Sequence, residues 1–313
     1  MSTTKKQQHY VWRHYLKAWA QNEKNIWAYF KSEQKIINPN LMGVAQERYF
    51  YELIDFTDKE EVFLEDFIKS ISHDSVVDLN INFLQIFTST NKLKKKIINN
   101  GIGGSNKEII EREIRVLEIN LMEDAHAKIE QLGTMLVDCV NSRNYKFLEN
   151  DDAFYETIMF LCFQYVRTKK MKRAIESSFA GNKSFNMFKF WNITSYAFAT
   201  TFARSLSFNP DIRFLFYENN TNVNFLTCDQ PIINILSDLI DENGNTKGFE
   251  WYYPLSPKLA LLVHLRTTQK TNIESLLINE PLVIYLNQKV IEYSEDFIFS
   301  DNKEQLELIN PTK

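Results

Sequence analysis

The chain has 313 residues, 44% of them hydrophobic, and carries a formal net charge of −4. Such a chain can bury a sizeable core, and its low net charge and high hydrophobic content exclude an intrinsically disordered protein. The acidic balance excludes nucleic-acid binding through the whole surface, although local Lys and Arg clusters could still contact phosphate. The three cysteines are widely spaced and odd in number, which argues against a disulfide framework or a zinc site.

Hydropathy along the chain predicts a cytoplasmic location. The N-terminal sequence MSTTKKQQHYVW lacks the apolar region of a signal peptide. No stretch approaches the ~18 consecutive apolar residues of a membrane span. We therefore expect no contact with a membrane.

Up to residue 208 the spacing changes from strand to helix. Alternating apolar residues predict strands over 25–31 and 48–53, and apolar residues spaced by three and four predict helices over 60–98. Ser105 and Glu108 form a capping box, which starts a helix that continues to about residue 140. Further helices are expected over 152–175 and 185–207.

After Asn209-Pro210 the pattern returns to strands. A hairpin is expected over 211–218 and 222–228, and strands are expected over 231–236, 248–255 and 258–266. A helix over 281–295 and a strand over 296–300 close the chain. These elements predict an α+β fold, with a helix-rich middle packed against a mostly antiparallel sheet built from the N-terminal strands and the C-terminal third. We expect one domain over 1–313, with a possible subdivision into a sheet region (1–58 plus 209–313) and a helical region (59–208).

Three residues are candidates for catalysis. His9 lies in an aromatic segment, and an imidazole can act as a general base or a metal ligand. Asp229 lies in the polar turn Thr227–Pro231 after a predicted strand, where site residues are common, although an Asp there can equally cap the backbone. Glu65 is a carboxylate on a predicted helix, where an exposed helix face is the simpler interpretation.

The helix over 152–175 ends in a basic cluster. Its members are Arg167, Lys169, Lys170, Lys172 and Arg173. They could form a stripe of phosphate contacts. They could also simply favour a helix C-terminus and solvate an exposed face. A second cluster, Lys92 with 94–96, allows the same two interpretations.

Several short motifs, taken in order, resemble the domain of unknown function 4238 family. These are His9-Tyr10-Val11, Tyr15-Leu16, the segment 164–168 (QYVRT), Thr227-x-Asp229-x-Pro231 and Pro254-Leu255-Ser256-Pro257. Trp12, Lys169, Cys228 and Gln230 depart from the usual family pattern. Some family members are similar to bacterial antiphage defence proteins. The resemblance, which spans roughly residues 8–300, implies functional positions at His9, Tyr15, Arg167, Asp229 and Pro231.

Three hypotheses follow. The first is a defence effector that hydrolyses nucleic acid, with His9, Asp229 and Glu65 as catalytic residues and an unknown cofactor for which a divalent metal would be suitable. Its substrate-binding residues would be Tyr15, Arg167, Lys169, Lys170 and Arg173. The second is a non-enzymatic sensor that recognises a phage component or a small ligand. In the third, the motifs only hold the fold together and Asp229 pairs with Arg167.

Overall fold

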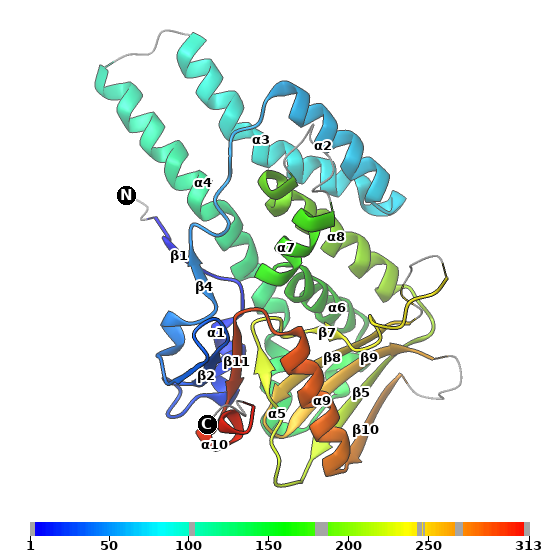
Figure 1. Ribbon diagram of the computed structural model, residues 1–313. Coiled ribbons are helices and arrows are strands. Elements are labelled where there is room, and N and C mark those ends of the chain that lie inside the picture. The colour runs from blue at the N-terminus through cyan, green and yellow to red at the C-terminus, as the bar shows by residue number, and fades with distance from the viewer. Residues whose placement is uncertain are drawn as a thin grey trace.

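The computed structural model describes residues 4–99, 104–178, 187–242, 246, 248–266 and 272–309. Helices form the middle of the chain, and strands from the two ends form the sheets (Figure 1). The predicted α+β class with a helix-rich middle is therefore confirmed. The strands form three separate sheets among the described residues, not the single sheet that the sequence pattern predicted.

The N-terminal segment contributes to two small sheets. β1 (Gln7–His9) pairs antiparallel with β4 (Gln46–Arg48), and β2 (Trp27–Phe30) pairs antiparallel with β3 (Lys35–Ile37). The helix α1 (Arg13–Leu16) lies between β1 and β2. The strand predicted over 25–31 is confirmed by β2, but the one over 48–53 is wrong. There the chain turns at Tyr49, whose φ is 60°, and the aromatic side chains that follow are buried without joining a ladder.

The helical middle contains seven named helices. They are α2 (Asp58–Ile71), α3 (Val77–Asn99), α4 (Gly104–Leu132), α5 (Thr134–Ser142), α6 (Asp151–Val166), α7 (Lys169–Ser178) and α8 (Met187–Ser207). The capping contact predicted for Ser105 lies outside the described side chains. Figure 1 shows α3 and α4 extending beyond the rest of the molecule.

Two predicted helices are each divided in two, which the apolar spacing does not indicate. The helix predicted over 105–140 breaks at Gly133, where a Cβ atom would collide with the buried ring of Phe160 from α6. The helix predicted over 152–175 breaks at Arg167 and Thr168, between α6 and α7. At this second break the Arg167 side chain lies against β1, where its Nη2 donates to the His9 carbonyl oxygen.

The C-terminal third forms a five-stranded sheet with the order β10-β5-β9-β8-β7. Its strands are β5 (Ile212–Asn219), β7 (Ile233–Asn234), β8 (Glu250–Ser256), β9 (Leu259–Leu265) and β10 (Ile273–Ile278). All neighbours are antiparallel except β10 and β5, which are parallel. In a four-stranded sheet with the order β3-β2-β11-β6, β6 (Thr227–Cys228) and β11 (Phe297–Ser300) join the N-terminal strands.

The hairpin predicted over 211–228 is wrong. β5 pairs with β9 and β10, whereas β6 pairs with β11 in the other sheet. The linking segment carries Phe225 and Leu226 into a hydrophobic core. The Phe225 amide donates to the carbonyl oxygen of Pro257 at 2.9 Å. Burial of these side chains therefore separates the two strands that a simple turn would have paired.

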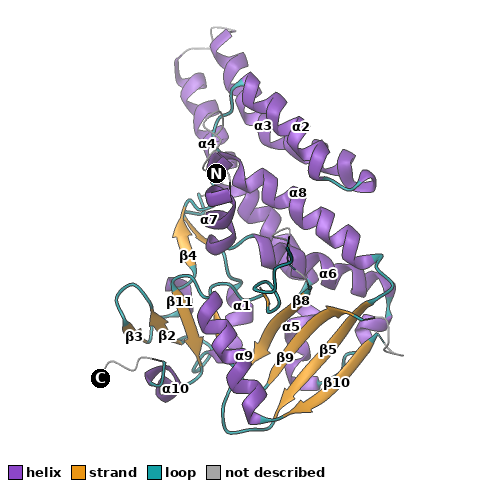
Figure 2. Ribbon diagram, turned by 45° about the vertical axis from the view of Figure 1, so that its right-hand side comes forward, coloured by secondary structure: helices purple, strands orange, loops and turns teal. Residues whose placement is uncertain are grey.

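Each face of the five-stranded sheet covers a core. Phe214 and Phe216 of β5 belong to the large core that includes the helical middle and the N-terminal segment. Leu215, between them, belongs to a second core with α9 (Glu280–Tyr293). This alternation is the expected pattern for a strand buried on both faces. Figure 2 shows α9 across the sheet, and α10 (Lys303–Glu307) near the C-terminus. None of the described helices is long and apolar enough to cross a membrane.

Candidate functional site

Motifs that lie far apart in the sequence meet at Tyr15. Its hydroxyl donates to the carbonyl oxygen of Pro254 at 2.7 Å and shares a 2.6 Å hydrogen bond with the Thr227 hydroxyl. The Tyr15 ring stacks on Tyr253 with 4.9 Å between centroids. All of these side chains are buried. Burial also raises the Tyr15 pKa well above its ordinary value, so its hydroxyl stays protonated.

Asp229 is buried and holds a loop. Its carboxylate accepts backbone amides from Glu295 at 2.8 Å, Asp296 at 2.7 Å and Phe297 at 3.1 Å. Burial raises the Asp229 pKa to about 6, although the three amides oppose that shift. The carboxylate predicted for catalysis is therefore bound to the backbone that leads into β11.

Gln230 connects the same turn to the break between α6 and α7. Its Oε1 accepts the Thr168 hydroxyl, and its Nε2 donates to the carbonyl oxygens of Tyr165 at 3.2 Å and Ile232 at 2.8 Å. The Cys228 thiol is buried and donates to the Gln230 carbonyl oxygen at 3.1 Å. Burial raises the pKa of this thiol, so it is poorly suited to act as a nucleophile.

Arg167 follows α6 and has a different set of partners. Its guanidinium is only 1% exposed. Nε donates to the Tyr10 carbonyl oxygen at 3.2 Å, and Nη2 donates to the His9 carbonyl oxygen at 3.0 Å and to Glu130 Oε1 at 2.7 Å. The predicted pair between Arg167 and Asp229 is therefore wrong: the carboxylate partner of Arg167 is Glu130 of α4.

Several titratable side chains lie close enough to this guanidinium for its charge to affect their pKa values. We call this group the Arg167 cluster and define it as Arg167, His9, Glu123, His126 and Glu130. Three of its members come from α4, where spacings of three and four place them on one face of the helix. The segment leading into β1 runs along that helix: the Lys5 amide donates to Asn120 Oδ1 at 2.8 Å, and Gln8 Nε2 donates to the Ile119 carbonyl oxygen at 2.6 Å.

The Arg167 cluster contains several buried polar atoms without a hydrogen-bond partner among the described residues. They are His9 Nε2, Glu123 Oε2, Arg167 Nη1 and both ring nitrogens of His126. Most buried polar atoms in proteins bond to other protein groups or to ordered water, so these atoms mark a place where water or a ligand would bind. His9, Glu123 and Glu130 are half-buried as residues, whereas the unpaired atoms themselves are buried.

Within the cluster, burial shifts the pKa values of the acid and the imidazole in opposite directions. Burial raises the pKa of Glu123 to about 7, against the opposing charge of Arg167. Burial lowers the pKa of His9, and the charges of Arg13 and Arg167 lower it further. His126 is driven well below its ordinary pKa by burial and by Arg167. Near neutral pH, His9 is therefore mostly uncharged, although hydrogen bonds with the Leu41 and Met42 backbone oppose the lowering of its pKa, and a fraction of Glu123 is protonated.

The other predicted site residues lie elsewhere or are engaged. Glu65 is on α2 and pairs with Lys69 at 2.6 Å. Lys169 pairs with Asp296 at 2.8 Å and with Glu47 at 3.5 Å, Arg173 pairs with Glu295, and Lys170 Nζ donates to the Tyr293 carbonyl oxygen at 2.9 Å. The predicted phosphate stripe is thus interleaved with carboxylates. In the second cluster, Lys92 pairs with Glu61 at 2.7 Å and Lys94 with Glu118 at 2.6 Å.

The sequence predicted an unknown cofactor, for which a divalent metal would be suitable. Within the described ranges, no three His, Cys, Asp or Glu side chains are placed where they could share a metal ion. This holds for His9, Glu123, Asp229 and Glu65 as well: none of them belongs to such a group.

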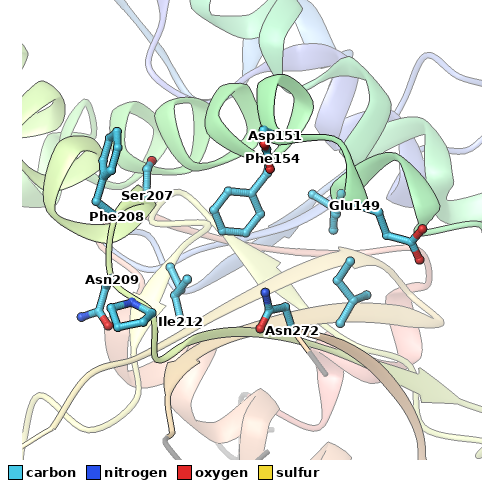
Figure 3. Close-up of a pocket in the computed structure, with 11 residues that line it drawn as sticks. Glu149, Asp151, Phe154, Ser207, Phe208, Asn209, Ile212 and Asn272 are labelled. Atoms are coloured by element: carbon cyan, nitrogen blue, oxygen red, sulfur yellow. The ribbon is translucent and has the colours of Figure 1, made fainter. Parts of the chain in front are cut away.

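A surface hollow lies away from the Arg167 cluster, between the helical middle and the five-stranded sheet. It has a volume of about 610 Å³. Figure 3 shows Phe154 pointing into it from α6, with Asn272 on the opposite side and Phe208 at one end. None of the residues predicted for the site lines it.

Sequence reasoning named His9 and Arg167 but missed their partners on α4. The sequence does contain a pattern that indicates these partners. The spacing of three and four puts Glu123, His126 and Glu130 on one helix face beside an apolar stripe. An acid, an imidazole and a second acid on one helix face would have singled out this segment.

The match with known families covers nearly the whole described fold. A family model described as protein of unknown function DUF4238 matches residues 7–304, from β1 into α10. Neither the curated proteins nor the solved structures contain a match to the chain. The family match agrees with the resemblance of the short motifs, several of which meet at Tyr15 and Gln230. The chain belongs to the DUF4238 family of proteins of unknown function.

Proposed function

We propose that the protein is an antiphage defence effector that hydrolyses a phosphate ester at the Arg167 cluster. The observation that carries the chemistry is the set of unpaired atoms on an acid, a base and a cation: Glu123 Oε2, His9 Nε2 and Arg167 Nη1. Pairs of titratable groups with opposed pKa shifts are typical of acid–base sites. The defence role is supported by the family resemblance of the motifs.

Each residue has a defined part in this reaction. His9 takes a proton from a water molecule as that water attacks phosphorus, and protonated Glu123 gives its proton to the oxygen of the P–O bond that breaks. Arg167 Nη1 donates to a phosphate oxygen, where charge accumulates in the transition state. Exchange of protons with solvent restores both groups, so the reaction consumes only water.

The substrate is proposed to be nucleotide-sized. The cations predicted to track a nucleic-acid backbone are paired with carboxylates, which makes the α7 surface unsuited to a long polyanion. The reactive groups lie near the surface only where His9, Glu123 and Glu130 are half-buried. A nucleotide, or the end of a nucleic acid, could place one phosphate there.

The test uses purified protein and three variants. Nucleotides, short RNA and short DNA are incubated with the wild type, with and without Mg²⁺, and released phosphate or cleaved strands are measured. Glu123→Gln and His9→Gln should each lower the rate by about 10²–10⁴-fold, the usual contribution of a general acid or base. The matched control is Glu111→Gln, an exposed position on the same helix, which should retain the wild-type rate.

The pH profile and a phage assay complete the test. The wild-type rate should be bell-shaped, with the alkaline limb near pH 7 because Glu123 must be protonated. Cells expressing the wild type should resist phage, and cells expressing Glu123→Gln should not. Hydrolysis that survives both Glu123→Gln and His9→Gln would exclude the Arg167 cluster as the active centre.

The surface hollow favours a second candidate, a sensor that binds a small ligand. A volume of about 610 Å³ is within the range of small-molecule sites, and Phe154 and Phe208 give it an aromatic lining. Asn272→Trp would fill the hollow, and Asn220→Trp is a control at an exposed position that does not line it. Cells expressing Asn272→Trp could lose phage resistance while cells expressing Asn220→Trp or Glu123→Gln keep it. That result would favour the sensor over the hydrolase.

A further inference from the structure

β10 is the outermost strand of the five-stranded sheet. In the described part of the chain it pairs only with β5, and Figures 1 and 2 show it at the border of the sheet. A strand in this position presents a row of backbone N–H and C=O groups along its outer edge. Such an edge is a ready template for another extended strand.

The parallel pairing with β5 determines which residues face outward. The Phe214 amide donates to the Asn272 carbonyl oxygen at 2.8 Å, so the even-numbered residues of this segment bond toward β5. Ile273, Ser275 and Leu277 therefore direct their backbone groups to the free edge. Three outward residues offer three amides and three carbonyl oxygens.

The side chains leave this edge unprotected. Leu276 is 51% exposed and Leu277 is 62% exposed. Natural edge strands are usually guarded by Lys, by Pro or by a bulge. β10 has none of these: its sequence is IESLLI, with Glu274 as the single charged residue, and its pairing with β5 has no break in register. An exposed, regular and aliphatic edge is typical of an interaction surface.

We infer that β10 pairs antiparallel with β10 of a second copy of the chain, so that the two five-stranded sheets become one continuous sheet. Outward-facing residues must oppose one another in such a pair. Centring the two-fold axis on Ser275 places Ile273 opposite Leu277 of the other copy, and Ser275 opposite itself. This register uses all three outward residues of each strand.

The charge pattern favours a second copy as the partner. In this register Glu274 lies opposite Leu276 of the other copy, so the only carboxylates of the two strands are not placed face to face. A register centred on Glu274 would oppose two like charges, which destabilises a strand pair. Ile273 and Leu277 meet as an apolar pair on one face of the joined sheet. The strand is thus complementary to itself.

Cysteine cross-linking tests the register. In a hydrogen-bonded antiparallel pair the Cα atoms are about 5.5 Å apart, which suits a disulfide. Ser275→Cys should therefore yield a disulfide-linked dimer under mild oxidation. In Leu277→Cys the two thiols are four residues apart along the strand, about 13 Å, and should not cross-link. The native thiols Cys139, Cys162 and Cys228 are buried and should stay unreactive.

Light scattering on purified full-length chain tests the interface itself. The wild type should have twice the mass of one chain at micromolar concentration. Leu276→Lys combined with Leu277→Lys should give a monomer, because Lys guards a strand edge. Ile284→Lys combined with Leu308→Lys replaces two exposed aliphatic residues away from the edge, 53% and 85% exposed, and should remain a dimer. A monomeric wild type, or equal cross-linking of both cysteine variants, would overturn the inference.

Discussion

Two buried polar centres lie on either side of the α6–α7 break, and they differ in how completely they are bonded. At the Asp229 turn, both carboxylate oxygens and the Gln230 amide have backbone or side-chain partners. In the Arg167 cluster, atoms of His9, Glu123, His126 and Arg167 have none among the described residues. The first arrangement is that of a structural joint, and the second is the place where we propose that substrate binds.

How completely a buried polar residue is hydrogen-bonded helps to interpret a sequence motif that looks functional. Asp229 and Arg167 both lie in short motifs that resemble the DUF4238 family, and both are fully buried. The two residues differ in whether all of their side-chain polar atoms have hydrogen-bond partners among the described residues. Asp229 acts on the loop before β11, whereas Arg167 keeps one nitrogen of its guanidinium unpaired. We therefore expect substitutions at the first centre to affect folding and substitutions at the second to affect activity.

The largest expected effect is at Asp229. Asp229→Ala removes the acceptor of three backbone amides and should cost about 3–5 kcal/mol, because each unpaired buried donor costs about 1–3 kcal/mol. Asp229→Asn retains one acceptor oxygen and should lose less. Urea denaturation measures both, with Asp66→Ala on the exposed face of α2 as the control. A stable but inactive Asp229→Ala protein would contradict the structural role of this turn.

The next effect concerns the pH dependence of stability at Glu123. Its folded pKa, about 7, lies above its ordinary value of 4.5, so the charged form is disfavoured in the folded state. Stability from this group is fully present below the unfolded pKa and is lost as the pH rises through about 7. At about 1.4 kcal/mol per pKa unit, the loss is up to about 3 kcal/mol.

Glu123→Gln isolates this contribution. The variant cannot ionise at this position, so its stability should fall less than that of the wild type over the same pH range. Asp229, whose pKa is also raised, titrates in both proteins and cancels in the comparison. Parallel pH curves for the two proteins would show that Glu123 has an ordinary pKa and would weaken its assignment as the acid.

A smaller effect is expected at Tyr15. Tyr15→Phe leaves the Pro254 carbonyl oxygen and the Thr227 hydroxyl without the Tyr15 partner, at a cost of about 2 kcal/mol. The ring and its stacking on Tyr253 remain, so the fold should be retained. Thermal denaturation measures the loss, and Tyr155→Phe at an exposed position of α6 is the control. Loss of activity without loss of stability would instead support the binding role first predicted for Tyr15.

The sequence allowed the fold class, and the positions of most helices, to be predicted because apolar spacing reports burial. It did not reveal the break at Gly133, because that break depends on the ring of Phe160 from another helix. It did not reveal that β5 and β6 lie in different sheets, because the burial of Phe225 and Leu226 decides this. His9 and Arg167 could be named from motifs, but the partner of Arg167 could not. Glu130 is 37 residues away in the chain, and the packing of α4 against α6 brings it near.

The smallest effect is expected where the basic residues of α7 meet carboxylates. Arg173 is half-exposed and pairs with Glu295, and exposed pairs contribute about 0–1 kcal/mol. Glu295→Gln should therefore change stability by less than about 1 kcal/mol, because the amide that Asp229 binds belongs to the Glu295 backbone and is kept. The same substitution removes the nearer of the two carboxylates beside Arg173, which keeps Asp296 at 3.9 Å. If α7 were a nucleic-acid track masked by this pair, Glu295→Gln would bind RNA or DNA more tightly at low salt. We expect no such gain, because Lys169 still pairs with Asp296 and Lys170 still bonds to the Tyr293 carbonyl oxygen. A gel-shift assay of wild type and variant decides between a surface that only closes the fold and one that also binds a polyanion.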